Sequence, residues 1–266
     1  MSTQSTASTS LTLPVKINLY WDCFVPKDRY DEIDQTFKVN LQNPLFDRII
    51  CYYCKANEGS NYVPEPNPKV ELVEMRAPLP YYDDLFHLTN SKSGHYDINI
   101  LCNNDIIFGH WIRYTLNNLV DPSTFFCLSR YELEEKWSGS WVDIPKFNSD
   151  LKPCSQDVWV YRGMMKTTFG HFAKGNNWGC DEVIGEEAHR NGYTVSNPSK
   201  LFPTFHNHMS QVRENWPNGT NQSRHMYTPN RTRGRFAPYD PLKELMPYPE
   251  LGYFGFAVPV YKPLVI

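Results

Sequence analysis

The sequence predicts an α/β fold with a mostly parallel central sheet and helices on both of its faces. Apolar, strand-like runs alternate with segments of helical periodicity from residue 15 to residue 200, which is the order expected when crossover helices join parallel strands. The chain has 266 residues, 41% of them hydrophobic, and this is enough for one large core. Because no internal repeat or linker-like stretch interrupts this span, we expect a single domain over residues 15–215.

The first half of the chain supplies three strands and two helices. An apolar run at 15–21 ends at Asp22 and predicts the first strand. Residues 27–43 then carry four apolar side chains on one helical face, and Asn43-Pro44 ends the helix. Those four side chains are Tyr30, Ile33, Phe37 and Leu41. The segments that follow predict strands at 46–53 and 69–76 and a short helix at 81–90.

The second half continues the alternation. Its predicted elements are strands at 96–108, 124–132, 157–163 and 193–197 and helices at 110–120 and 181–191. Three polar residues interrupt the first of these strands before it resumes. Gly192 is placed to act as the C-cap of the last helix, and Pro198 ends the last strand.

Composition sets limits on location and partners. A net charge of -3 argues against nucleic acid and membrane surfaces as partners. Residues 1–14 are Ser/Thr-rich without signal-peptide character and predict a disordered tail, and no apolar run reaches the roughly 18 residues of a membrane span. The seven cysteines are scattered, with one Cys-x-x-Cys pair, Cys51 and Cys54, inside a strand-like run. Reduced structural thiols are therefore expected, in a cytoplasmic protein.

The C-terminal residues 216–266 are rich in proline and aromatic side chains, and we expect them to form an extension packed on the domain. Four arginines between positions 224 and 235 lie among Pro, Asn and Gly, a context typical of a loop. This loop is either simply solvated or binds an anion, and the sequence leaves both open. It also leaves the oligomeric state open.

Polar residues collect where the predicted strands end. The carboxyl ends of parallel strands meet at one edge of a sheet, and ligands bind there. The motif Asn103-Asn104-Asp105 follows one strand, and His206 and His208, two apart in an extended segment, share a face. Asp105 and the histidines could hold a divalent cation. Alternatively, the three-residue motif is only a turn and the histidines are a half-buried structural pair.

Several motifs, taken in order, resemble those of GT-A glycosyltransferases. They are "CNNDIIF", "SQDVWVYRG", "GCDEVIGEEAHRNGYTVSNPS" and "FHNHMSQVREN". The opening segment "KINLYWDCFVPKDRYDEIDQTFKVNLQNPLFDRII" and the segment "RAPLPYYDDLF" fit the same group. The resemblance is to the small soluble enzymes of large algal viruses and some bacteria, and it covers roughly residues 15–215. It implies a single GT-A (Rossmann-like) domain, in the host cytoplasm if the protein is viral.

The resemblance also implies a site. A nucleotide-sugar donor would be held by five residues, namely Tyr20, Asp22, Arg76, Asn103 and Asn104, although Tyr20 fits a core aromatic as well. Asp105 stands where the family's Asp-x-Asp motif binds Mn2+ (or Mg2+), and His208, with His206 as the alternate, would complete the metal shell. Asn103 replaces the motif's first acid, and this departure should weaken the affinity for the metal.

The implied reaction is an inverting, metal-dependent transfer of a sugar, most simply from a UDP-sugar, to a glycan hydroxyl. Asp181 matches the general base of such enzymes, and Glu182 is the alternate. Both acids also suit the first turn of a helix, where they cap it and oppose its dipole. A retaining mechanism stays open, since the fold hosts both stereochemistries. Two other functions also stay open. The chain could be a non-catalytic nucleotide-sugar or glycan-binding protein, favoured by Asn103, or a metal-dependent hydrolase built on Asp105, His206 and His208.

Overall fold

The structure is a computed structural model, and it describes residues 15–25, 28–57, 59–76, 82–151, 156–165 and 180–209. Within helix residues 180–183 only the backbone is described. The tail expected at 1–14, the extension expected at 216–266 and the arginine-rich loop at 224–235 all lie outside the described residues.

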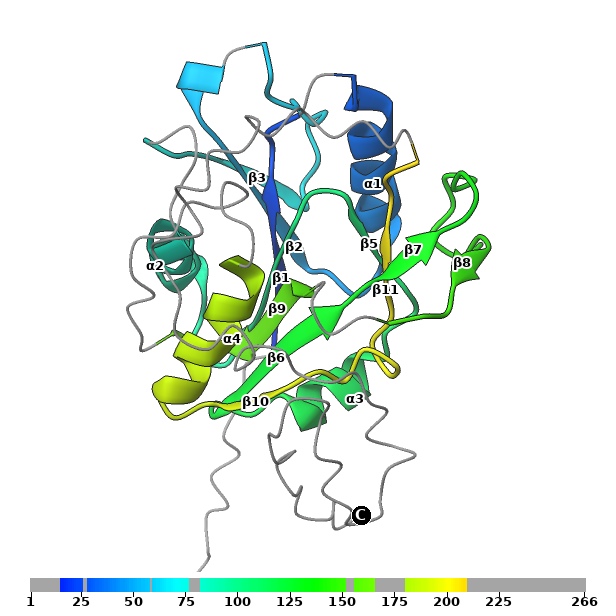
Figure 1. The fold of residues 1–266 in the computed structure, drawn as a ribbon. Coiled ribbons are helices and arrows are strands. Elements are labelled where there is room, and N and C mark those ends of the chain that lie inside the picture. The colour runs from blue at the N-terminus through cyan, green and yellow to red at the C-terminus, as the bar shows by residue number, and fades with distance from the viewer. Residues whose placement is uncertain are drawn as a thin grey trace, which may run out of the picture.

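A seven-stranded sheet forms the centre of the molecule, in the order β10-β6-β9-β4-β1-β2-β3 (Figure 1). Its strands are β1 (Ile17–Asp22), β2 (Arg48–Tyr53), β3 (Val70–Glu74), β4 (Ile98–Cys102), β6 (Thr124–Ser129), β9 (Gln156–Arg162) and β10 (Thr194–Ser196). Neighbouring strands are parallel except at β9, which runs antiparallel to both β4 and β6. The predicted α/β fold with a mostly parallel sheet is therefore confirmed.

Helices cover both faces of this sheet, because its strands are apolar on both sides. The helices are α1 (Tyr30–Gln42), α2 (Tyr82–Lys92), α3 (Arg113–Leu119) and α4 (Cys180–Arg190), with a 3-10 turn, η1, at Lys55–Asn57. Alternate residues of β1 show the division: Leu19 and Trp21 pack in one core with α1 and α3, while Tyr20 packs in the other with α2 and α4. In α1, Ile33 and Phe37 are buried as expected, whereas Tyr30 at the first turn is 54% exposed.

A smaller sheet of four strands lies beside the first, in the order β5-β11-β7-β8. Its strands are β5 (Ile106–Phe108), β7 (Tyr131–Leu133), β8 (Phe147–Asn148) and β11 (Thr204–His206). The strands predicted at 96–108 and 124–132 are each divided between the two sheets. The expected interruption at Asn103-Asn104-Asp105 is confirmed, whereas the prediction of one continuous strand at 124–132 is wrong. The chain changes sheet at residues 103–105 and again at Arg130, because these polar side chains bond to other segments and do not continue a buried ladder.

The small sheet is attached to α1 through one buried amide. β5 is an edge strand, and its outward backbone groups need partners. The Nδ2 of Asn40 donates to the carbonyl of Ile106 (2.8 Å), and its Oδ1 accepts from the N–H of Phe108 (3.1 Å). Asn40 has no exposed surface, and the apolar side chains of the small sheet pack against the neighbouring Val39. The direction in which the chain leaves residue 105 is thereby fixed.

Two local predictions from the sequence hold. Gly192 follows α4 with a φ of 87°, and the backbone N–H groups of Gly192 and Tyr193 donate to carbonyls in the last turn, as expected of a glycine C-cap. Among the described residues, five buried cysteines form no disulfide: Cys23, Cys51, Cys54, Cys102 and Cys127. They are structural thiols, as the sequence predicted.

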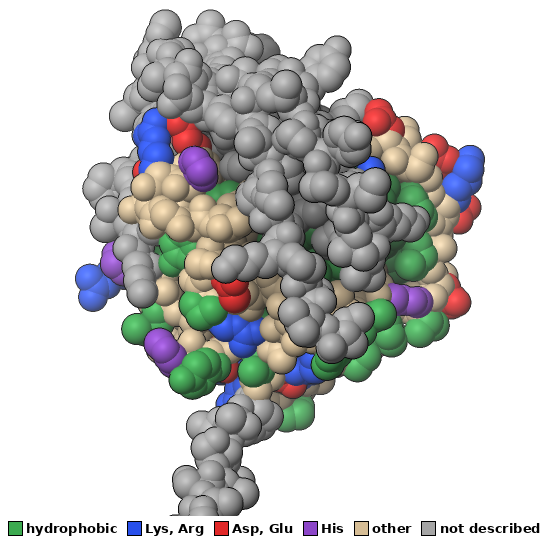
Figure 2. Space-filling view, turned by 90° about the horizontal axis from the view of Figure 1, so that it is seen from below, with side chains coloured by type: hydrophobic (Ala, Val, Ile, Leu, Met, Phe, Trp, Pro, Cys, Tyr) green, Lys and Arg blue, Asp and Glu red, His purple; other side chains and the backbone are tan. Residues whose placement is uncertain are grey.

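No helix in the described ranges combines the length and the apolar character that a membrane crossing requires. The face seen in Figure 2 carries basic, acidic and apolar side chains mixed together where it is described.

Replacing Asn40 with Ala should lower the free energy of unfolding by about 1–3 kcal/mol, because the change leaves backbone groups of Ile106 and Phe108 without partners in a buried place. Chemical denaturation measures this. The matched control is Asn118→Ala on the exposed side of α3, expected to change stability by less than about 0.5 kcal/mol. Equal effects at the two positions would contradict the role given to Asn40.

Candidate functional site

The site lies where β9 begins. Because β9 is antiparallel to its neighbours, its first residues lie beside the last residues of β4 and β6, with Val158 opposite both Cys102 and Leu128. Asp157 is therefore flanked by the residues that follow those two strands. The Nδ2 of Asn103 donates to Oδ1 of Asp157 (2.6 Å), and Nη1 of Arg130 lies 2.6 Å from its Oδ2.

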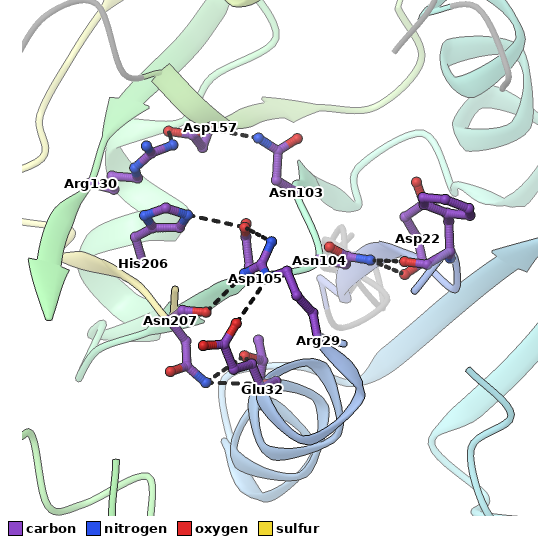
Figure 3. Close-up of polar contacts among 12 residues, drawn as sticks. Asp22, Arg29, Glu32, Asn103, Asn104, Asp105, Arg130, Asp157, His206 and Asn207 are labelled. Carbon is purple, nitrogen blue, oxygen red and sulfur yellow. Dashed lines mark hydrogen bonds and ion pairs between the residues drawn. The ribbon is translucent and has the colours of Figure 1, made fainter. Parts of the chain in front are cut away.

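The three residues after β4 point in three directions (Figure 3). Asn103 faces Asp157, as described above. Asn104 donates its Nδ2 to the carbonyls of Asp22 (3.2 Å) and Phe24, so it holds the loop that follows β1. Asp105 faces the small sheet and α1. The Asn103-Asn104-Asp105 motif is thus more than a turn, since each of its side chains has a separate partner.

Strand β11 brings His206 to Asp105. It pairs with β5 on one side, where His206 is opposite Ile106, and with β7 on the other, where His206 is opposite Glu132. The two ring nitrogens of His206 contact a carboxylate each. Nε2 lies 3.0 Å from Oδ2 of Asp105, and Nδ1 lies 2.6 Å from Oε2 of Glu132.

Asp105, His206 and His208 form a cluster suited to a metal ion. Each offers one ligand atom, and these atoms all lie within 4.8 Å of one another. The two imidazole rings are 5.2 Å apart between centroids. The 3.0 Å between Oδ2 of Asp105 and Nε2 of His206 matches the edge of an octahedron with metal–ligand bonds of about 2.1 Å, which is about 3.0 Å. The predicted set of three residues therefore does come together. One carboxylate and two imidazoles suit Mn2+ and similar divalent ions.

Arg29, at the start of α1, lies on the other side of Asp105. Its Nη1 is 3.2 Å from Oδ2 of Asp105, its Nε is 2.8 Å from Oε2 of Glu32, and its Nη2 donates to the carbonyl of Asn207 (3.2 Å). Burial opposes ionisation of Asp105, but the charge and hydrogen bond of His206 and the two nearby arginines outweigh it. They hold the pKa of Asp105 well below its usual range, so the carboxylate is charged and ready to bind a cation.

His206 is protonated between its two carboxylates when no metal is bound. Burial lowers its pKa, but the charge of Asp105 and the hydrogen bonds to Asp105 and Glu132 outweigh burial and raise it to about 9. The pKa of Glu132 is held at about 2, since the hydrogen bond and charge of His206 outweigh the effect of burial. A metal ion at Nε2 must therefore displace a proton.

The remaining expected site residues are placed as follows. Tyr20 is fully buried, its hydroxyl contacts the carbonyl of Thr89 and Oδ1 of Asn99 (3.3 Å each), and burial raises its pKa. It is a core aromatic, so the expectation that it binds the nucleotide is corrected: no face of its ring is open to a ligand. Asp22 accepts a hydrogen bond from the N–H of Phe24 (3.0 Å) at the end of β1.

Arg76 follows β3, and its side chain is exposed. Asp181 and Glu182 fall in the first turn of α4, and their side chains lie outside the described residues. Their expected roles therefore stay predictions.

Sequence reasoning missed four charged residues of the site: Arg29, Glu32, Arg130 and Glu132. One signal was available for Arg130, because it directly follows a buried strand, where polar side chains approach the edge of the sheet. Glu132 lies two residues further on, in β7. Arg29 and Glu32 gave no such signal, since charged residues at a helix start are common on helix geometry alone.

No family model matches this chain, and no curated protein matches it. Among solved structures, a mannosyltransferase from Pyrobaculum calidifontis in complex with GDP-Man and Mn2+ is similar at 10% identity with a TM-score of 0.42, covering 74% of this chain and 58% of that chain. An inositol-1-phosphate CTP transferase from T. maritima is similar at 11% identity with a TM-score of 0.37, covering 76% of this chain and 93% of that chain.

A 2-C-methyl-D-erythritol 4-phosphate cytidylyltransferase from Francisella tularensis is similar at 13% identity with a TM-score of 0.34, covering 55% of this chain and 72% of that chain. TM-scores below 0.5 at such identities do not establish a shared activity. The function proposed below therefore rests on the residues of the site.

In chelator-treated protein, the stability lost by His206→Gln should depend on pH. The folded pKa of about 9 exceeds the unfolded value of about 6.5, so protonated His206 contributes stability that is fully present below about pH 6.5 and is lost as the pH rises through about 9. Urea denaturation of both proteins at pH 6.5 and pH 10 measures this difference, which should shrink at the higher pH. His87→Gln, at an exposed position of α2, should show no such change.

Proposed function

We propose that this protein is a metal-dependent glycosyltransferase that moves a sugar from a nucleotide-diphosphate sugar, most simply a UDP-sugar, to a glycan hydroxyl with inversion. The observation that supports it best is the convergence of Asp105, His206 and His208 just beyond the carboxyl end of β4. Open, mostly parallel α/β sheets bind ligands at that edge. The motifs that resemble GT-A glycosyltransferases run through the same residues.

The three clustered side chains would hold Mn2+ or Mg2+. A divalent cation bound there supplies positive charge to the diphosphate oxygens of the donor. Arg130 lies close enough to lower the pKa of Asp105, so it adds positive charge to the same place. Asp22 and Arg76, at the ends of β1 and β3 on either side of β2, would line the nucleotide pocket.

The acceptor side would be served by α4. This helix leads into β10, which is parallel to β6, so the start of α4 lies toward the edge where the parallel strands end (Figure 1). Asp181 in its first turn would take the proton of the acceptor hydroxyl. The acceptor oxygen then bonds to the anomeric carbon as the bond from that carbon to the diphosphate breaks. A single displacement of this kind inverts the anomeric centre, and Glu182 is the alternate base.

Nucleotide binding should require the metal cluster. Calorimetric titration of UDP and GDP into the protein should show UDP binding that needs Mn2+ and that weakens at least about 100-fold in Asp105→Asn, because the variant loses a charged ligand. Asp143→Asn, an exposed acid outside the cluster, is the matched control and should bind like the wild type. If neither UDP nor GDP binds, with or without Mn2+, the proposal is contradicted.

A metal-dependent hydrolase is the second candidate, because Asp105, His206 and His208 would serve it equally well. Incubation of a UDP-sugar with Mn2+, with and without glycan acceptors, separates the two. A transferase forms a new glycoside when an acceptor is present, whereas a hydrolase releases free sugar at the same rate in both cases.

Asp181→Asn should abolish sugar transfer while leaving Mn2+-dependent UDP affinity within about threefold of the wild type, because a general base acts on the acceptor and not on the donor. Rates with an accepted donor–acceptor pair and the calorimetric affinity measure the two effects. Glu182→Gln is the neighbouring control and should keep most of the rate. The reverse pattern would make Glu182 the base.

A further inference from the structure

Asn103 stands where the resembling family carries an acid, and the structure gives this position a different task. Resting on the metal site of the proposed function, we propose that Asn103 is not a metal ligand. It is the first of four positioning residues, Asn103, Asp157, Arg130 and Glu132, that hold His206 with its Nε2 toward Asp105. We call these four residues the relay.

The relay begins with a buried carboxylate. Asp157 is 2% exposed, so both of its oxygens need partners. Oδ1 accepts from Nδ2 of Asn103 at 2.6 Å, and Oδ2 lies 2.6 Å from Nη1 of Arg130. An aspartate at position 103 would place a second carboxylate at hydrogen-bond distance from the first, where the two would repel. The amide at 103 is therefore required by Asp157.

Arg130 carries the interaction from the large sheet to the small one. Its guanidinium joins two carboxylates, since Nη1 pairs with Asp157 and Nε lies 3.0 Å from Oε1 of Glu132. The side chain of Glu132 is 52% exposed, so only its contacts with Arg130 and His206 fix its orientation. Arg130 itself is 17% exposed in its side chain and is held by the buried Asp157. The buried end of the relay thus orders the exposed end.

Glu132 then orients the metal ligand. Its second oxygen, Oε2, accepts from Nδ1 of His206 at 2.6 Å. A histidine whose Nδ1–H is held by a carboxylate presents Nε2 as its free ligand atom, with the ring fixed. Nε2 of His206 points at Oδ2 of Asp105, across the gap that fits an octahedral edge. Asn103, which directly follows β4, thereby controls the orientation of His206, 103 positions further along the chain.

The test is Mn2+ binding by calorimetry in the full-length protein carrying Asn103→Asp. If residue 103 were a ligand, the new acid would tighten binding. The relay predicts that N103D binds Mn2+ about 10–100-fold more weakly than the wild type, the usual cost of disturbing partners of metal ligands. The charge-exchanged double variant N103D/D157N restores one amide and one carboxylate and should bind more tightly than N103D. Tighter binding by N103D than by the wild type would overturn the relay.

Glu132→Gln supplies a second test, since it removes the charge that joins Arg130 to His206. It should weaken Mn2+ binding about tenfold. Glu134→Gln is the matched control, because Glu134 lies two residues along and pairs with Lys146 at the surface. It should leave Mn2+ binding unchanged. Thermal unfolding in chelator shows whether each variant is folded. Equal Mn2+ affinities for E132Q and E134Q would count against the relay.

A measurement without metal keeps this inference separate from the proposed function. The Nδ1–H proton of His206, assigned with His206→Gln, should give a downfield NMR signal in chelator-treated wild type that is lost in N103D and recovered in N103D/D157N. Absence of Mn2+ binding by the wild type would refute the metal site. An unchanged Nδ1–H signal in N103D would refute the relay.

Discussion

The reversed direction of β9 in an otherwise parallel sheet is the constraint on which the candidate site depends. A parallel sheet alone brings only strand ends to its carboxyl edge. The inserted antiparallel strand adds a strand start at the same edge, and Asp157 is in it, between the residues that follow β4 and β6. The segments that follow β4 and β6 then leave for the small sheet. The buried carboxylate of Asp157 therefore lies where these two segments meet the start of β9.

The buried charges of Asp157, Asp105 and Arg29 at this junction are stable because each of them is paired. Asp157 and Asp105 are each held by two cationic or amide partners, and the guanidinium of Arg29 is joined to a carboxylate on either side. Removing one partner of such a set leaves an unpaired buried charge, which typically costs about 3–5 kcal/mol. The same pairing orders the side chains before any ligand arrives, and this suits a site that must hold a cation in a fixed geometry.

The proposed function rests on chemistry at specific positions and not on overall similarity. A carboxylate held ionised, with two imidazoles within reach of one metal, at the edge of the sheet where ligands bind, fits the handling of a diphosphate-linked donor. The asparagine at 103 looks like a lost ligand when the motif is taken by itself. Beside Asp157 it is the residue that the local charge requires.

The sequence by itself predicted the strands of the central sheet, the four helices and their order, because apolar periodicity is a local property. It also picked out Asp105, His206 and His208 from strand ends and spacing. It could not reveal that the segments after β4 and β6 leave the central sheet for a second one, and it left open whether Tyr20 is buried. It also missed Arg29, Arg130 and Glu132. Their partners lie far along the chain: 76 positions separate Arg29 from Asp105, and 74 separate Glu132 from His206. Which charged side chains meet across such separations is decided by the direction and register of strands, and only the tertiary structure fixes these.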